Sequence, residues 1–249
     1  MDLKKVEKKV ANIVKMASKL YHNKSFFEVV EKHKYEKDDV TNNDIKTQDF
    51  LRNKLLKLIP DSCFIGEEGS EINNNSYVWI IDPIDGTQNY KKGLPLYGTQ
   101  VALQHDNKTV LSVIYFPELK ELYVASENGA TLNGKQIKVS DRTDIGWSIA
   151  LVGNYAAYSE IEKKYKIQEK LVSSFKTVRI LGCSALNYAL CASGKIESVV
   201  VFGNTIWDLV PGRFLVEKSG GVVYTNENLN LHIAGNVELV NKIKKLLGV

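Results

Sequence analysis

The sequence contains little cysteine, and its three cysteines, Cys63, Cys183 and Cys191, lie far apart in the chain. Three scattered cysteines exclude a disulfide framework and a zinc cluster of closely spaced ligands. We therefore expect three buried thiols in a reducing cytoplasm. Long apolar runs are absent as well, so the sequence predicts neither a signal peptide nor a membrane span. We expect a soluble, cytoplasmic protein.

The net charge is small, because 33 lysine and arginine residues stand against 29 aspartate and glutamate residues, which gives +4. Basic and aromatic residues do not cluster, so nucleic acid is not an expected partner. The slight positive balance favours a small anionic molecule instead. The hydrophobic content of 44% is ordinary for a globular protein, and 249 residues suffice for one large domain or two smaller lobes.

The order of sequence patterns predicts two subdomains, 1–145 and 146–249, separated where polar turn residues cluster near Ser140–Gly146. Apolar residues at helical spacing predict a helix over 3–20 and a second one that ends before Pro60. Gly98–Ala125 alternates like an antiparallel meander. In the second part strands and helices alternate: strands over 149–152, 177–181, 198–202 and 221–224, helices over 161–175, 185–192, 207–218 and 237–247.

The segment Trp79–Tyr90 carries the strongest chemical signal. The apolar run Tyr77–Ile81 predicts a buried strand, which should end at Asp82 because the next residue is proline. Asp85 follows three residues later, and paired carboxylates suit Mg²⁺. Gly86 would let the backbone approach an anion, and a helix that begins after it would offer free amides. The alternative is an ordinary turn, since Asp-Pro and Asp-Gly pairs are common in turns.

Three other acidic positions each have two interpretations. Asp44 lies in the first turn of the second predicted helix, where it would either interact favourably with the helix terminus or take part in a site. Glu67 follows a glycine and would lie in a solvated loop unless the fold brings it to Asp82. Asp208 begins a helix, where it would be either a cap or a third carboxylate beside Asp82 and Asp85.

Three motifs, in this order, resemble those of the inositol monophosphatase family of metal-dependent phosphatases. Gly66-Glu67-Glu68 is similar to the acidic loop of that family, and Asp82–Tyr90 is similar to its D-P-[IL]-D-G-T-x-N-[FY] signature. Trp207-Asp208, followed by Gly220-Gly221, is similar to its W-D…G-G signature. Arg179, Gly182, Ala185 and Leu186 also resemble a family segment, and the resemblance covers nearly the whole chain.

The resemblance implies a layered α-β-α-β-α sandwich, with an antiparallel N-terminal sheet followed by a mixed C-terminal sheet, and a homodimer. It implies that Mg²⁺, or Mn²⁺, is the cofactor and that Li⁺ inhibits. It also implies site residues: Thr87, Asp44 and Glu67 for activation of the attacking water; Glu67, Asp82, the carbonyl of Ile84, Asp85 and Asp208 for metal binding; Asp85, Gly86, Thr87, Ser184 and Val201 for substrate contact.

The resemblance predicts a Mg²⁺-dependent phosphomonoesterase acting on inositol monophosphate or a related sugar or polyol phosphate. Inositol-specific members carry an acid seven residues before the W-D aspartate, where this chain has Val201, so a strict preference for inositol phosphate is not expected. Gly203-Asn204-Thr205 weakly resembles a segment of the 3′-phosphoadenosine nucleotidases. Fructose-1,6-bisphosphatase and 3′-nucleotidase activities are therefore alternatives, and a non-catalytic protein that binds a phosphorylated ligand is an alternative of another class. Ser184 would be a substrate contact or a simple helix cap.

Overall fold

The computed structural model describes residues 3–22, 29–31, 39–71, 75–153, 161–203 and 205–249. These residues form α1 (Leu3–Ser18), α2 (Asn42–Leu58), α3 (Thr87–Lys91), α4 (Ile161–Ser174), α5 (Ser184–Ala192), α6 (Ile206–Lys218) and α7 (Val237–Leu247). Two short 3₁₀ helices lie at Ile145–Trp147 and Glu227–Leu229. None of the helices so described has the length and apolar character needed to cross a bilayer.

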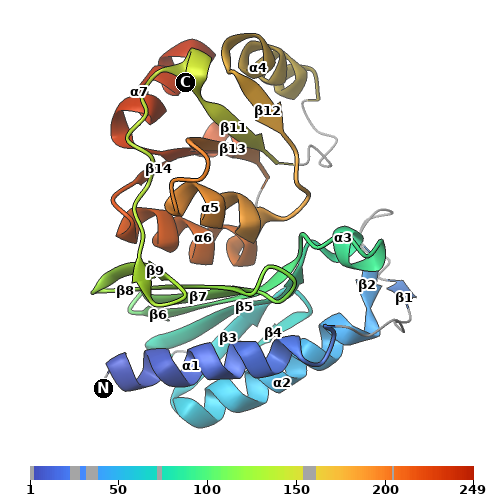
Figure 1. The fold of residues 1–249 in the computed structure, drawn as a ribbon. Helices are drawn as coiled ribbons and strands as arrows, with labels where there is room; N and C mark the ends of the chain where they lie inside the picture. The colour runs from blue at the N-terminus through green and yellow to red at the C-terminus, as the bar shows by residue number, and fades with distance from the viewer. Residues whose placement is uncertain (1–2, 23–28, 32–38, 72–74, 154–160, 204) are drawn as a thin grey trace.

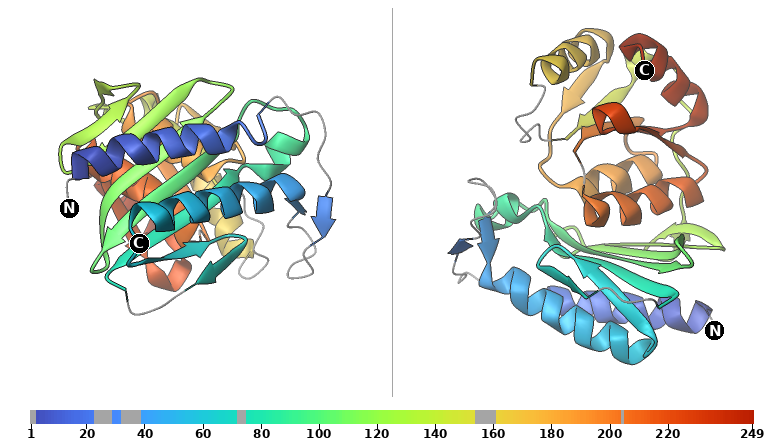
Figure 2. Two further views of the ribbon diagram at one scale, coloured as in Figure 1. Left: turned by 90° about the horizontal axis from the view of Figure 1, so that it is seen from below. Right: turned by 180° about the vertical axis from the view of Figure 1, so that it is seen from behind.

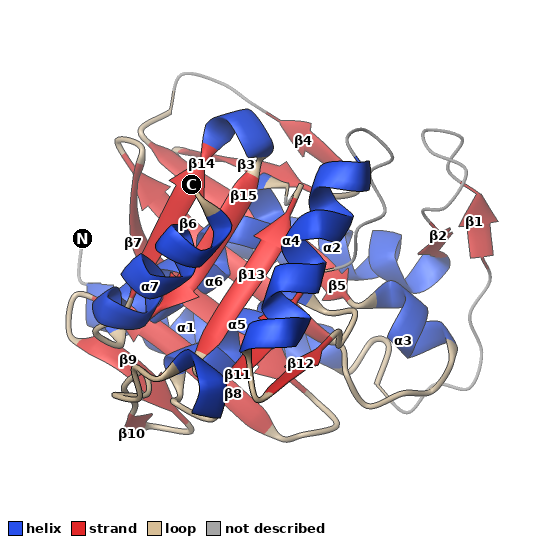
Figure 3. Cartoon of the chain, turned by 90° about the horizontal axis from the view of Figure 1, so that it is seen from above, coloured by secondary structure: helices blue, strands red, loops and turns tan. Residues whose placement is uncertain are grey.

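The helices and sheets stack in five layers (Figure 1). Helices α1 and α2 cover the outer face of an eight-stranded sheet, and α5 and α6 fill the space between that sheet and a five-stranded one. Helices α4 and α7 lie over the far face of the five-stranded sheet (Figure 3). The predicted α-β-α-β-α sandwich is therefore confirmed.

The eight-stranded sheet has the order β10-β9-β8-β7-β6-β5-β3-β4. Its strands are β3 (Ser62–Gly66), β4 (Gly69–Glu71), β5 (Tyr77–Asp85), β6 (Gly98–His105), β7 (Lys108–Phe116), β8 (Glu121–Ser126), β9 (Gly129–Leu132) and β10 (Lys135–Gln136). The N-terminal sheet is antiparallel, as predicted, except that β3 pairs with β5 in parallel, which makes the sheet mixed at this one place. A further two-stranded sheet pairs β1 (Val29–Glu31) with β2 (Asp39–Thr41).

Helices α1 and α2 lie side by side across the strands (Figure 2). Val6, Val10 and Val14 recur every four residues, so one face of α1 is buried. That face packs in one hydrophobic cluster with Trp79 and Ile81 of β5. Because side chains alternate along a strand, the next residue after Ile81 points to the other face of the sheet, toward α5 and α6. This alternation directs the first motif aspartate into the interior of the sandwich.

The five-stranded sheet has the order β12-β11-β13-β15-β14. Its strands are β11 (Ile149–Val152), β12 (Thr177–Arg179), β13 (Ser198–Phe202), β14 (Val222–Asn226) and β15 (Leu231–Gly235). Strand β11 pairs in parallel with β12 and β13, whereas β15 is antiparallel to both β13 and β14. The mixed C-terminal sheet is thus confirmed, but its strand β15 was not predicted.

Candidate metal and phosphate site

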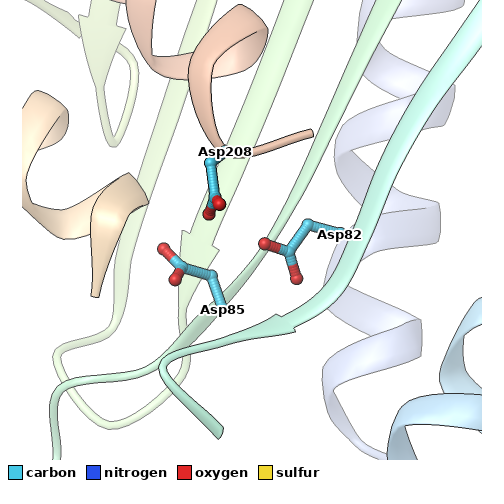
Figure 4. Close-up of side chains that lie close together, drawn as sticks. All are labelled: Asp82, Asp85 and Asp208. Atoms are coloured by element: carbon cyan, nitrogen blue, oxygen red, sulfur yellow. The ribbon is translucent and has the colours of Figure 1, made fainter. Parts of the chain in front are cut away.

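Three aspartates from distant parts of the chain lie together between the two sheets (Figure 4). Asp82 and Asp85 belong to the end of β5, and Asp208 lies in the first turn of α6. One carboxylate oxygen of each lies within 4.8 Å of those of the other two. The pairing of β5 with β6 shifts between Asp82 and Asp85, so this end of the strand departs from regular pairing. The structure thus brings together the three acids that the motifs supply.

Asp82 is the most deeply buried of the three clustered aspartates, with 2% of its surface exposed. Its Oδ2 accepts a hydrogen bond of 3.1 Å from Nε2 of Gln100, whereas its buried Oδ1 has no hydrogen-bond partner among the described residues. Burial raises the pKa of the Asp82 carboxyl well above its ordinary value, and the charges of Glu67 and Asp85 raise it further. A buried, unpaired carboxylate oxygen surrounded by other acids suits a divalent cation.

Asp85 is bound by the N-terminus of α5. Its Oδ1 accepts a 3.1 Å hydrogen bond from the amide of Ser184, and its Oδ2 accepts from the amide of Ala185 and, at 3.2 Å, from Sγ of Cys183. Cys183 occupies the cap position but makes no side-chain cap bond, so Asp85 satisfies the free amides of this helix. Burial raises the pKa of Asp85, and these donors oppose the shift.

Glu67 follows β3 directly and is half-buried. Its backbone amide donates to the carbonyl of Ile81 at 3.3 Å, which ties the acidic loop to β5. Gln48 of α2 holds the same loop, because its Oε1 accepts a 2.9 Å hydrogen bond from the amide of Glu68. Glu67 does not belong to the cluster of three carboxylates, but its negative charge raises the pKa of Asp82. It therefore lies at the edge of the site rather than in a remote loop.

Asp44 belongs to the capping box of α2 and also contacts the central motif. Its Oδ2 accepts from the amide of Thr41 at 2.9 Å and from the Thr41 hydroxyl, as the acid of a capping box at the start of α2. Its Oδ1 lies 3.3 Å from the hydroxyl of Thr87, which lies 2.9 Å from the carbonyl of Ile84. Burial raises the pKa of Asp44. One carboxylate thus joins α2 to the start of α3.

Gly86 connects the two motif aspartates to α3 with a left-handed backbone, at φ +85°. An added Cβ there would lie 2.7 Å from the carbonyl oxygen of Leu96. The Gly86→Ala substitution is therefore expected to lower the free energy of unfolding by about 1–3 kcal/mol, measured by chemical denaturation. Gly134 is the matched control, since it has φ +80° but no atom near its added Cβ. Equal losses in both variants would show that the contact with Leu96 adds nothing.

The two remaining predicted substrate residues lie in different surroundings. Ser184 is the first residue of α5, and its amide is engaged by Asp85. Val201 lies on β13, is only 1% exposed and belongs to the hydrophobic cluster between the sheets. An added Cβ on Gly153 would lie 2.9 Å from Cγ1 of Val201, so the two residues pack closely. Their contacts with substrate stay predictions, and Asn204 lies outside the described residues.

Sequence reasoning missed three polar residues that support the acids: Thr41, Gln100 and Cys183. All three are buried. Gln100 and Cys183 stand in no motif, whereas Thr41 belongs to a turn-like segment that was expected to cap the second helix. A second signal was the polar Thr99-Gln100 pair, directly beside Gly98 and ahead of the apolar run Val101–Leu103.

The chain is similar to known proteins over most of its length. A model of the inositol monophosphatase family matches residues 2–245. The fructose-1,6-bisphosphatase/inositol-1-monophosphatase of Thermotoga maritima is 33% identical over 195 residues, which cover 78% of this chain and 74% of that protein. The Nus factor SuhB of Escherichia coli K12 is 31% identical over 206 residues, covering 80% of this chain and 77% of that protein.

Solved structures have the same fold. An IMPase of Thermotoga maritima superposes with a TM-score of 0.85 at 28% identity, covering 100% of this chain and 97% of that one. The extragenic suppressor protein suhB of Bartonella henselae superposes with a TM-score of 0.83 at 26% identity, covering 97% of this chain and 94% of that one. Together with the family match over nearly the whole length, these likenesses show that the chain belongs to the inositol monophosphatase family, a family of phosphatases.

Proposed function

We propose that this protein is a Mg²⁺-dependent phosphomonoesterase that hydrolyses inositol monophosphate or a related sugar or polyol phosphate. The observation that carries the proposal is the convergence of Asp82, Asp85 and Asp208, with one buried oxygen of Asp82 left unpaired. Three acids held this close repel one another unless a cation lies among them.

Asp82, Asp85 and Asp208 would hold one cation, and Asp82 with Glu67 and the carbonyl of Ile84 would hold another. Oxygen-only donors favour Mg²⁺ or Mn²⁺ over Zn²⁺. When bound, such cations supply an activated water and neutralise the charge that develops on the leaving oxygen. The family resemblance also carries the expectation that Li⁺ inhibits.

The chain's own groups would orient the reactants. The Thr87 hydroxyl lies between an ionisable acceptor, Asp44, and the carbonyl of Ile84, so its position is determined from two sides. We infer that this hydroxyl orients the attacking water, with Asp44 as its proton acceptor. The amides of Gly86 and Thr87 would bind the phosphate, because Gly86 has no side chain to keep the anion away.

The substrate is tested with a panel of phosphate esters: inositol 1-phosphate, fructose 1,6-bisphosphate and 3′-phosphoadenosine 5′-phosphate. The bisphosphate is included because a relative is named for both activities. We expect phosphate release from inositol 1-phosphate or a similar ester that requires Mg²⁺, stops with EDTA and is inhibited by Li⁺. If Mg²⁺ stimulates release from no ester in a broad panel, the proposal fails and a non-catalytic ligand-binding role is favoured.

A further inference from the structure

Gln100 is a fully buried polar residue that lies directly opposite Asp82, on β6. The three residues that follow it, Val101, Ala102 and Leu103, are buried and apolar. The Gln100 amide uses its Nε2 to donate to Oδ2 of Asp82, whereas its buried Oε1 has no hydrogen-bond partner among the described residues. An unpaired buried amide oxygen is unfavourable, so packing alone does not explain a glutamine at this position.

The backbone pairing beside Asp82 is incomplete, which leaves the carboxylate in need of other support. Pro83 has no amide to donate, and the register of β5 with β6 shifts between Asp82 and Asp85. Where the backbone hydrogen bonds between β5 and β6 are interrupted, side chains of β6 form hydrogen bonds to β5 instead. The hydroxyl of Thr99 donates to the carbonyl of Pro83 at 2.8 Å, and the neighbouring Gln100 binds Asp82 from the opposite face of the strand.

The uncharged amide of Gln100 is a suitable hydrogen-bond donor to a carboxylate that binds a cation. One Asp82 oxygen is directed toward Asp85 and Asp208, as Figure 4 shows. A lysine or arginine beside Asp82 would bring a positive charge that competes with a bound cation. An amide N–H fixes the carboxylate without that charge, so Gln100 holds the ligand and leaves the negative charge of the cluster intact.

From these contacts we propose that Gln100 is a positioning residue for the cation site, which fixes the carboxylate of Asp82 in the orientation that binds the metal. The inference rests on the proposed function, since it concerns the same site. Gln100 does not touch the substrate; it acts through Asp82. A partner that orients a metal ligand typically changes metal affinity when it is removed, by about 10–100-fold.

The test is direct binding of Mg²⁺ to the full chain, measured by calorimetry without substrate. Gln100→Met keeps the length of the side chain and removes the N–H donor, so we expect Mg²⁺ to bind about 10–100-fold more weakly. The melting temperature in EDTA should change little, because the substitution removes the hydrogen bond to Asp82 but also removes the buried, unpaired Oε1. Excess Mg²⁺ should restore turnover, as expected for a defect in metal binding and not in folding.

Gln104→Met is the matched control. Gln104 lies four residues further along β6 on the same face, and its Nε2 donates to the hydroxyl of Thr109 at 3.4 Å rather than to an acid. This variant should bind Mg²⁺ like the unchanged protein. Gln100→Leu removes the same donor with a different shape, so weak binding in both Gln100 variants comes from the missing N–H.

Two outcomes overturn the inference in distinguishable ways. If both Gln100 variants bind Mg²⁺ as tightly as the unchanged protein and Gln104→Met, Gln100 does not position Asp82, and the proposed function stands. If the unchanged protein itself binds no Mg²⁺, the metal site and the proposed function fail together.

Discussion

Asp82→Asn is expected to reduce phosphate release at saturating Mg²⁺ by at least about a thousandfold, equivalent to about 4 kcal/mol of transition-state stabilisation. Asp82 lies at the centre of the acidic cluster, and it is the one acid proposed to serve both cation positions. Asparagine has nearly the same shape and its oxygen still accepts from Gln100, but it carries no charge to attract a cation. Release of inorganic phosphate from the best ester of the panel measures the effect.

The same substitution should stabilise the metal-free protein. Burial and neighbouring acids raise the pKa of Asp82, so the ionised carboxylate opposes folding near neutral pH. In EDTA at neutral pH, Asp82→Asn should therefore melt at a higher temperature than the unchanged protein. The difference in melting temperature between the two proteins should narrow as the pH falls through the raised pKa of Asp82. The carboxyl of the unchanged protein then takes up a proton, so the unfavourable burial of its charge is lost.

These two results separate function from folding. A variant that is inactive because it is misfolded would melt lower in EDTA, whereas the expected variant is inactive and more stable. Turnover close to that of the unchanged protein would contradict the phosphatase proposal. A lower melting temperature at every pH would contradict the claim that burial of this charge is costly.

Local patterns predicted most of the fold because most elements have one clear apolar face or run. Helix α7 begins at Val237 and ends at Leu247, as its pattern predicts. Strand β15 was missed because His232 interrupts a run of only five residues; in the sheet, β13 and β14 flank it and all five residues are buried. The parallel pairing of β3 with β5 could not be predicted from a local pattern either. It joins residues such as Cys63 and Val78, and the short strand β4 lies between these two strands in the sequence.

The acids of the site could be predicted, but their support could not. Asp82, Asp85 and Asp208 stand in motifs, and their convergence follows from the family resemblance. The donors that hold them are set by sheet register and helix packing: Gln100 lies opposite Asp82 only because β6 pairs with β5 in one register. The thiol of Cys183 reaches Asp85 only because α5 points its N-terminus at β5. Such contacts depend on tertiary structure, which no short pattern encodes.

Thr87→Val is expected to lower kcat by about 10²–10⁴-fold while KM changes little. Valine keeps the branched shape but cannot donate to Asp44 or orient a water, so only the transition state loses an interaction. Thr87→Ser keeps the hydroxyl and should retain most of the activity. Steady-state kinetics at saturating Mg²⁺ distinguishes kcat from KM.

Loss of the half-buried Thr87 hydroxyl should also lower the stability of the fold, and a substitution at Thr109 serves as the control for this effect. The Thr87 hydroxyl binds the carbonyl of Ile84, so its removal should destabilise the fold by about 0.5–1.5 kcal/mol. Thr109→Val removes a half-buried hydroxyl that bonds Gln104 outside the site, and it should leave kcat unchanged. Asp44→Asn keeps an oxygen that can cap α2 but loses the negative charge beside Thr87, so it should slow turnover with little loss of stability. If Thr87→Val has the same kcat as Thr109→Val, the Thr87 hydroxyl only stabilises the local backbone, and other groups must orient the water.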